Sequence, residues 1–137
     1  MRRVKSYSYD VILLVGQKIV EITRFGKYLA LHLDNGMFLN IHLRMSGRFL
    51  VNANSEDDPK HSHVIINTDN HRVLFIDPRT FGEMWITSET TPEIGRGIDA
   101  LLAPNVDLQK VLMKLAVKST KPIKAVLLDQ QYISGIG

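Results

Sequence analysis

Residues 27–43 read KYLALHLDNGMFLNIHL, and this stretch decides the fold. Apolar and polar residues alternate on both sides of the tripeptide DNG at 34–36. The apolar positions form two sets with the spacing of one strand face each: Leu29, Leu31 and Leu33, then Leu39, Ile41 and Leu43. Alternation with period two is typical of a half-buried strand, and Asn-Gly favours a tight turn because both positions tolerate positive φ. The stretch therefore predicts an antiparallel β-hairpin.

More strands are predicted on both sides of this hairpin. Residues 17–25 (QKIVEITRF) indicate a preceding strand, and residues 63–77 (HVIINTDNHRVLFID) indicate a second hairpin that turns near Asp69 and Asn70. Residues 82–87 (GEMWIT) indicate a further strand. The polar segment 52–60 (NANSEDDPK) contains a proline and predicts a loop between the two hairpins.

The hydrophobic period then changes from two to about 3.6. Residues 106–118 (VDLQKVLMKLAVK) predict a helix, with Asn105 or Asp107 as its N-cap. Its apolar positions follow the i, i+3, i+4, i+7 pattern: Leu108, Val111, Leu112 and Leu115. A second helix is expected to start near Pro122, within residues 121–132 (KPIKAVLLDQQY). The predicted class is α+β, an antiparallel two-layer β-sandwich over residues 1–90 followed by a linker and a helical domain over residues 91–137.

Composition limits the classes of protein that this chain can belong to. The 137 residues suit one domain, or one small domain with an appendage, and 45% hydrophobic with 23% charged residues is ordinary for a globular protein. No apolar run approaches 18 residues, so we expect no membrane span, and Asp10 at the start of the first apolar stretch favours mature protein over a signal peptide. The absence of cysteine excludes disulfides and thiolate metal sites and fits a reducing compartment.

Charge is distributed unevenly along the chain. Residues 1–48 carry eight Lys/Arg against three acids (+5), residues 49–104 carry four against nine (−5), and residues 105–137 carry five against two (+3). If the two basic segments meet on one face, they form a binding surface for a polyanion. The alternative is scattered, solvated charge.

A histidine pair and a lysine are candidate functional residues, and each also has a purely structural explanation. His61 and His63 would face the same side of a strand and could share a metal ion, although no third ligand is evident and a plain surface role is more common. Lys27 is expected at the start of a strand among other cationic groups, where a lysine can act as a general acid or nucleophile. The alternative for Lys27 is an exposed edge-strand lysine that discourages aggregation.

The segment FIDPRTFGEMW at 75–85 sets Arg79 and Phe81 side by side in a turn-like stretch. In the segment HLRMSGRF at 42–49, Met45 precedes a glycine turn and can project from the end of the sheet, although a core position is the usual outcome for Met, as it is for Phe81. An apolar residue, a cation and an aromatic ring at loop tips are the groups that proteins insert into a DNA base stack. Met45, Arg79 and Phe81 are therefore a candidate wedge.

Four segments together resemble the formamidopyrimidine-DNA glycosylase / endonuclease VIII family: TRFGKYLALHL, IHLRMSGRFLV, KHSHVIINTDNHRVLFIDPRTFGEMW and TKPIKAVLLDQQYISGIG. The resemblance covers nearly the whole chain in the right order. It implies a two-layered β-sandwich, then the first helices of a helix-two-turn-helix DNA-binding domain. It also implies base-excision repair in the bacterial cytoplasm, with removal of oxidised bases followed by nicking of the abasic strand. The implied partner is double-stranded DNA with oxidised or abasic sites.

The resemblance also implies roles for individual residues. Lys27 matches the lysine that donates a proton during β-elimination, and His61 and Arg79 match residues that contact DNA. Met45, Arg79 and Phe81 match the triad that fills the gap left by a flipped nucleotide. Two further positions lie where the family has a basic, DNA-contacting run: Lys118 and Ser119.

Two departures accompany this resemblance. Family members begin with a proline and a glutamate that carry out catalysis, whereas this sequence begins MRR, and the four-cysteine zinc finger has no counterpart among residues 1–137. We therefore expect an internal fragment of the family pattern with no cofactor of its own and impaired activity. The alternative is a catalytically inactive remnant that binds damaged DNA.

Overall fold

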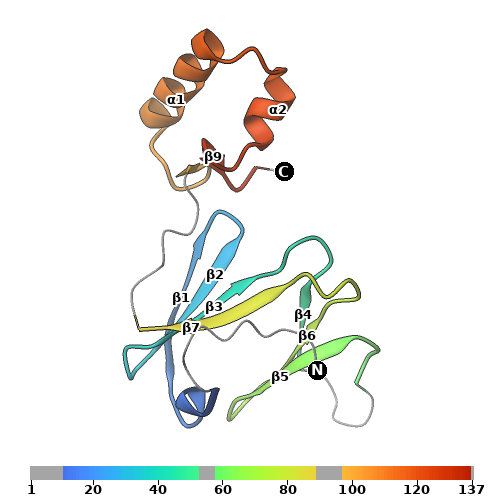
Figure 1. Cartoon of the computed structure of the whole chain (residues 1–137). Coiled ribbons are helices and arrows are strands. Elements are labelled where there is room, and N and C mark those ends of the chain that lie inside the picture. The colour runs from blue at the N-terminus through green and yellow to red at the C-terminus, as the bar shows by residue number, and fades with distance from the viewer. Residues whose placement is uncertain (1–10, 53–57, 89–96, 137) are drawn as a thin grey trace.

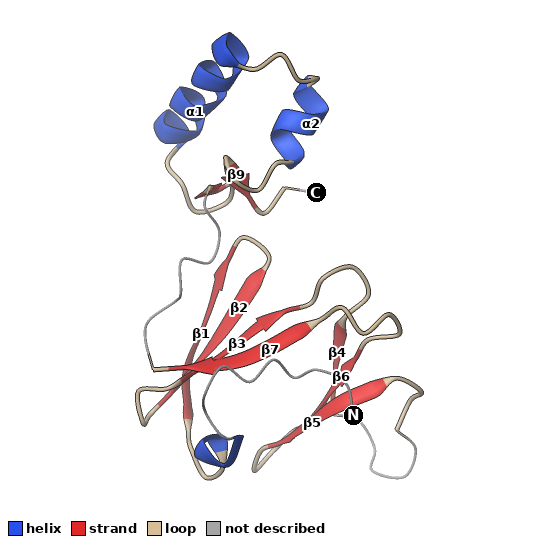
Figure 2. Cartoon of the chain, viewed as in Figure 1, coloured by secondary structure: helices blue, strands red, loops and turns tan. Residues whose placement is uncertain are grey.

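A computed structural model describes residues 11–52, 58–88 and 97–136 of the chain. Two antiparallel sheets pack face to face, and a small helical unit follows them (Figure 1; Figure 2). The first sheet has the order β1-β2-β3-β7 and the second β4-β6-β5. The first sheet consists of β1 (Ile19–Phe25), β2 (Tyr28–Leu33), β3 (Phe38–His42) and β7 (Glu83–Thr87). The second consists of β4 (Arg48–Val51), β5 (Ser62–Asn67) and β6 (Arg72–Ile76). The predicted α+β class with a two-layer β-sandwich is confirmed.

The hairpin at 27–43 forms as its alternation predicts. Strands β2 and β3 pair antiparallel with Leu29 opposite Ile41 and Leu31 opposite Leu39, so both apolar sets lie on one face of the sheet. Gly36 takes φ +80°, which an asparagine-glycine turn permits. The second predicted hairpin and the strand at 82–87 form as β5–β6 and β7. Strand β4 and a short 3-10 helix, η1 (Val11–Leu14), were not predicted individually.

The core lies between the two sheets. Ile41, Phe75 and Met84 are buried at its centre, and side chains from both sheets surround them: Leu29, Leu31, Leu39, Leu43, Phe49 and Val64. Phe49 and Phe75 come from paired positions of β4 and β6, with ring centroids 5.5 Å apart. Burial of these apolar surfaces provides the driving force for sheet packing.

The helical unit contains β8 (Ile98–Asp99), α1 (Asn105–Lys118), α2 (Ile123–Leu128) and β9 (Ile133–Ser134). Strands β8 and β9 pair in parallel and close the base of the two helices (Figure 1). Helix α1 occupies the predicted range, but the predicted N-cap is wrong. Pro104 is the N-cap, without a side-chain cap, and its carbonyl accepts hydrogen bonds from the N–H groups of Asp107 and Leu108.

The two helices bury fewer apolar side chains than their sequence patterns suggest. Among the four apolar positions of the predicted α1 face, only Leu115 is buried, and Val126 is the buried residue of α2. Helix α2 ends at Leu128 because Asp129 takes an extended conformation and its carboxylate accepts a hydrogen bond from the Gln131 N–H. The second helix is therefore shorter than expected.

Several expectations fall partly or wholly outside the described residues. They are the reading of residues 1–10 as part of the mature protein, the loop residues 53–57, and the boundary between residues 90 and 91. Within the described ranges, no helix is long and apolar enough to span a bilayer.

Candidate nucleic-acid interface

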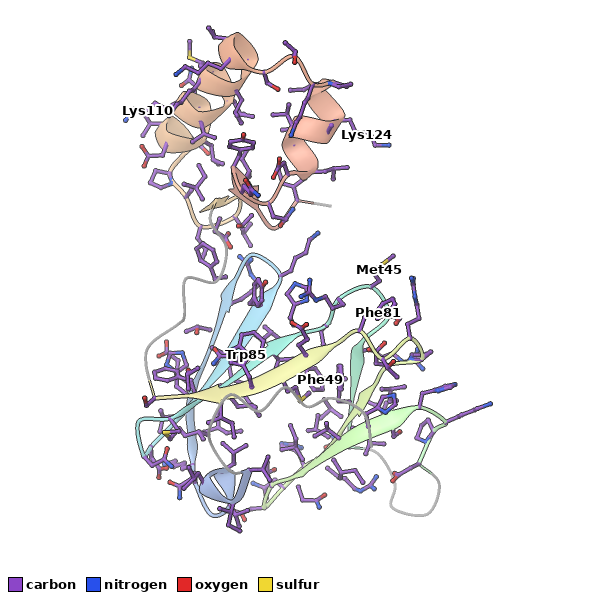
Figure 3. All side chains as sticks on the ribbon, viewed as in Figure 1. Met45, Phe49, Phe81, Trp85, Lys110 and Lys124 are labelled. Carbon is purple, nitrogen blue, oxygen red and sulfur yellow. The ribbon has the colours of Figure 1, made fainter. Side chains whose placement is uncertain are left out.

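Three connections lie along the same side of the sandwich (Figure 1). They are the β1–β2 turn at residues 26–27, the β3–β4 loop at residues 43–47 and the β6–β7 loop at residues 77–82. We call residues 43–47 and 77–82 the tip loops. Figure 3 shows that Met45 and Phe81, one from each tip loop, lie at the same end of the sandwich.

The tip loops expose the three candidate wedge residues. The Met45 side chain is 75% exposed and Phe81 is 52% exposed, so neither takes the core position that is usual for its residue type. Arg79 is exposed as well, and its guanidinium carbon lies 5.1 Å from the centroid of the Phe81 ring. A cation at this distance is attracted to the ring and aligns the two side chains. The structure thus presents an apolar, a cationic and an aromatic group on adjacent loops.

Asp77, the first residue of the tip loop at 77–82, is buried at 1% exposure. Its carboxylate accepts hydrogen bonds from the Ser46 hydroxyl, from the Gly82 N–H at 2.7 Å and from the Arg79 N–H at 3.3 Å. Burial alone would raise the pKa of Asp77, but these hydrogen bonds and one from the Phe81 N–H hold it below its ordinary value. A carboxylate that stays ionised in the interior therefore connects both tip loops.

His61 and His63 also contact Asp77, by hydrogen bonds to its main-chain N–H and carbonyl groups. The His61 carbonyl accepts a hydrogen bond from the Asp77 N–H at 3.0 Å, and His63 Nε2 lies 2.8 Å from the Asp77 carbonyl oxygen. His61 takes φ +72° and precedes β5, so strand alternation does not extend to it. No group of three His, Cys, Asp or Glu side chains suited to a metal ion occurs within residues 11–52, 58–88 and 97–136.

Lys27 occupies the β1–β2 turn and is exposed. The neighbouring His42 is 7% exposed, and the centroid of its ring lies 4.3 Å from the centroid of the Tyr28 ring. Burial lowers the pKa of His42, and the positive charges of Arg44 and Lys27 lower it further against the opposing effect of Glu83. His42 Nδ1 accepts the Arg44 N–H at 3.0 Å, which is consistent with a neutral ring. Lys27 and Arg44 thus both lie close enough to His42 to act on its charge, and Arg44 also pairs with Glu83 at 3.0 Å.

A second buried carboxylate fixes the turn that carries Lys27. Asp99, in β8, accepts hydrogen bonds from both terminal nitrogens of Arg24, at 2.9 and 3.2 Å, and from the N–H of Gly26. Its Oδ1 also accepts the N–H groups of Leu101 and Leu102. Burial would raise the pKa of Asp99, but these hydrogen bonds lower it to about 2. We call this group of contacts the Asp99 junction, because it attaches the β1–β2 turn to the helical unit.

The close fit at the Asp99 junction requires glycine at position 26. Gly26 takes φ +55°, and a Cβ atom there would lie 3.0 Å from the Cβ of Ser134 in β9. Sequence reasoning missed Asp77, Arg24 and Asp99. The signals available were an Asp-Pro pair inside the wedge segment and an acidic residue that ends the glycine-rich segment GRGID at residues 95–99.

Lys118 and Ser119 lie in the helical unit, at the C-terminal end of α1. Lys118 ends α1 and is exposed, and Ser119 is the C-cap, with its hydroxyl accepting the N–H of Lys121 at 3.2 Å. The connection between α1 and α2 is at the end of the helical unit that faces away from the sandwich (Figure 1). The structure therefore does not bring these two residues to the tip loops.

The sequence matches the model of one protein family, described as the formamidopyrimidine-DNA glycosylase N-terminal domain, over residues 3–84. The chain belongs to the formamidopyrimidine-DNA glycosylase family. This confirms the resemblance drawn from the four sequence segments.

Curated relatives and solved structures agree with the family assignment. The formamidopyrimidine-DNA glycosylase of Lactiplantibacillus plantarum is 38% identical over 128 residues, which cover 90% of this chain and 47% of that protein. The enzyme of Ureaplasma parvum is 39% identical over 131 residues, with 91% and 47% covered. The chain therefore spans about half the length of these relatives.

Two structures of the Lactococcus lactis glycosylase resemble the fold closely. One is a complex with DNA containing an abasic site, with a TM-score of 0.76 and 28% identity over 90% of this chain and 47% of that one. The other is a complex with DNA containing Fapy-dG, with a TM-score of 0.74 and 27% identity over 92% of this chain and 49% of that one.

Proposed function

We propose that this chain recognises damaged double-stranded DNA in base-excision repair, through the tip loops of its β-sandwich. The observation that carries the proposal is the exposure of Met45, Arg79 and Phe81 on two adjacent loops that share one buried carboxylate. An apolar side chain and an aromatic ring can replace lost base stacking, and a guanidinium can hydrogen-bond an orphaned base. Oxidised and abasic sites are the proposed targets, because such sites open the stack most easily.

Basic side chains supply affinity that does not depend on damage. His61, Lys118 and Ser119 are proposed as further contacts to DNA, with Lys118 on phosphate. A phosphate contact adds affinity and salt dependence but carries no information about the base. The wedge residues supply the preference for damage. We propose that binding needs no metal or cofactor, and a titration with and without a chelator tests this.

The proposed chemistry is DNA glycosylase activity with AP lyase nicking. Lys27 is the proposed catalytic residue, as the proton donor during β-elimination at an abasic sugar. It is exposed at the turn beside the tip loops, and its charge acts on the nearby buried His42. Of this chemistry we expect at most weak nicking of pre-formed abasic sites, and no base excision, from residues 1–137 alone. The second candidate function is damaged-DNA binding without catalysis.

Two assays separate these functions. The first measures strand nicking on a duplex with one abasic site, for the wild type and for Lys27→Ala. Lys18→Ala is the matched control, since Lys18 is an exposed lysine just before β1, whereas Lys27 follows that strand. Nicking that is lost in Lys27→Ala and kept in Lys18→Ala supports catalysis through Lys27. Binding to the abasic duplex without any nicking supports the second candidate.

The second assay measures binding to abasic and intact duplexes over a range of salt concentrations. The proposal expects tighter binding to the abasic duplex at every concentration. Equal affinity for both duplexes would reject damage recognition. Efficient excision of an oxidised purine by residues 1–137 would contradict the expectation of no base excision and imply a nucleophile within these residues.

A further inference from the structure

We propose that Asp77 is a positioning residue that locks the two tip loops into one arrangement, so that Met45, Arg79 and Phe81 enter an opened base stack as a unit. The inference rests on the proposed function. It adds that damage recognition depends on a buried residue that does not itself reach the DNA.

The carboxylate of Asp77 connects segments that are distant in sequence. Ser46, which donates its hydroxyl to Oδ1, is 31 residues away in the other tip loop. The N–H groups of Arg79 and Gly82 donate to Oδ1 and Oδ2 from both sides of the exposed segment that holds Phe81. Ser46, which follows Met45, and Arg79 and Gly82, which bracket Phe81, are therefore all attached to one carboxylate.

The two tip loops also rest on the same aromatic ring. A Cβ atom at Gly82 would lie 2.4 Å from Cζ of Phe75, and one at Gly47 would lie 3.0 Å from Cε2 of that ring. Phe75 is 4% exposed and belongs to the core. A side chain at Gly82 would therefore collide with the ring and one at Gly47 would press against it, so both loops lie close to the core.

The main chain of Asp77 fixes a third segment. Its N–H donates to the carbonyl of His61, and its carbonyl accepts the N–H of Thr80 at 3.2 Å. His61 and Thr80 both have positive φ, 72° and 56°, which is a sparsely populated conformation for residues other than glycine. The hydrogen bonds to Asp77 hold these two residues in that conformation.

A carboxylate suits this role and an amide does not. The donors described around Asp77 are hydroxyl and N–H groups, so the site needs an acceptor at both oxygens. Asn in place of Asp keeps the size but turns an N–H₂ group toward one set of N–H donors, which leaves donors without acceptors. Loops that are ordered before binding lose less entropy when they bind, so releasing them should weaken the interactions that need both loops.

The test compares Asp77→Asn, Ser46→Ala and the control Asp58→Asn. Asp58, in the connection between β4 and β5, pairs with Arg72 of β6 at 2.7 Å and makes none of the tip-loop hydrogen bonds described above. The readout is the ratio of affinities for abasic and intact duplexes, measured on folded protein at a temperature well below unfolding. A purely structural role would lower the melting temperature and leave this ratio unchanged.

We expect Asp77→Asn to lower the ratio about tenfold and Ser46→Ala to lower it by a smaller factor, with Asp58→Asn unchanged. Amide hydrogen exchange of the free protein gives a readout that does not involve DNA. Asp77→Asn should speed exchange in residues 43–47 and 78–82 together.

Each outcome decides a separate point. A wild type without preference for the abasic duplex overturns the proposed function. A wild-type preference that persists in folded Asp77→Asn overturns the positioning role alone. If Asp77→Asn does not fold, Ser46→Ala decides, and an unchanged ratio with unchanged exchange in residues 78–82 overturns the coupling of the loops.

Discussion

Asp77 and Asp99 are both buried, at 1% and 4% exposure, yet they hold different parts of the molecule together. Asp77 receives a hydroxyl and main-chain N–H groups and arranges two loops of the sandwich. Asp99 receives the guanidinium of Arg24 as well as N–H groups and joins the β1–β2 turn to the helical unit. The difference indicates that loss of Asp77 disturbs loop geometry, whereas loss of Asp99 leaves a cation without its partner between two units.

The largest effect on stability is therefore expected from Asp99→Ala. Breaking a buried ion pair by removing one partner costs about 3–5 kcal/mol, and because Arg24 is 33% exposed we expect about 2–4 kcal/mol. Urea unfolding measures the change in the free energy of unfolding. Asp107→Ala is the control, since its pair with Lys110 is exposed and should contribute about 0–0.5 kcal/mol. Equal effects of the two variants would contradict the structural importance of the Asp99 junction.

Acid should weaken the same junction. The pKa of Asp99 is about 2 in the folded protein, below the ordinary value of about 3.9, so its contribution is complete above about pH 4 and is lost as the pH falls through 2. The shift corresponds to about 2.5 kcal/mol of stability at neutral pH. Stability measured between pH 5 and 2 should fall less steeply in Asp99→Asn than in the wild type. Parallel curves would show that other carboxylates cause the loss.

A substitution in the tip loops, in contrast, should weaken DNA binding and leave stability nearly unchanged. Phe81→Ala removes a ring that is 52% exposed, so the free energy of unfolding should change little. Binding to an abasic duplex should weaken by about 1–3 kcal/mol, the range for stacking between a base and an aromatic ring. Thermal unfolding and fluorescence titration measure both quantities on the same protein. A variant that is strongly destabilised would place Phe81 in the core of the fold and not at the interface.

The smallest effect on stability is expected from glycine substitutions, which test whether the Asp99 junction is tightly packed. Gly26 and Gly36 both have positive φ, +55° and +80°, so Ala at either position is strained by about 1 kcal/mol. Only Gly26 lies against another segment, since an added Cβ would lie 3.0 Å from Cβ of Ser134, whereas nothing lies within 4 Å at Gly36. Denaturant unfolding of Gly26→Ala should therefore show the larger loss. Equal losses would mean that the turn and β9 are not in close contact.

The sequence predicted the parts of the fold that depend on local patterns. Alternation around the Asn-Gly turn predicted the β2–β3 pairing, and the change of period predicted α1. The N-cap of α1 was predicted wrongly because the carbonyl of Pro104 begins the hydrogen-bonded turn without any side-chain cap.

Long-range contacts account for what the sequence did not reveal. Asp99 and Arg24 are 75 residues apart and Asp77 and Ser46 are 31 apart, so no local pattern marks either pair. The exposure of Met45 and Phe81 was suggested by their places in turn-like segments and by resemblance to a family, whereas their residue types alone favoured the core. The close approach of Gly47 and Gly82 to Phe75, which positions both loops over the core, is another contact that no local pattern reveals.

The most direct test of the account pairs Arg79→Ala with Lys118→Ala. Each is titrated with abasic and with intact duplex at several salt concentrations. The account predicts that Arg79→Ala weakens binding to the abasic duplex more than to the intact one, because Arg79 meets the orphaned base only when the stack is open. It predicts that Lys118→Ala weakens both equally and reduces the salt slope by about one unit. If Arg79→Ala instead lowers both affinities by the same factor as Lys118→Ala, Arg79 is only a phosphate contact, and the tip loops do not recognise damage.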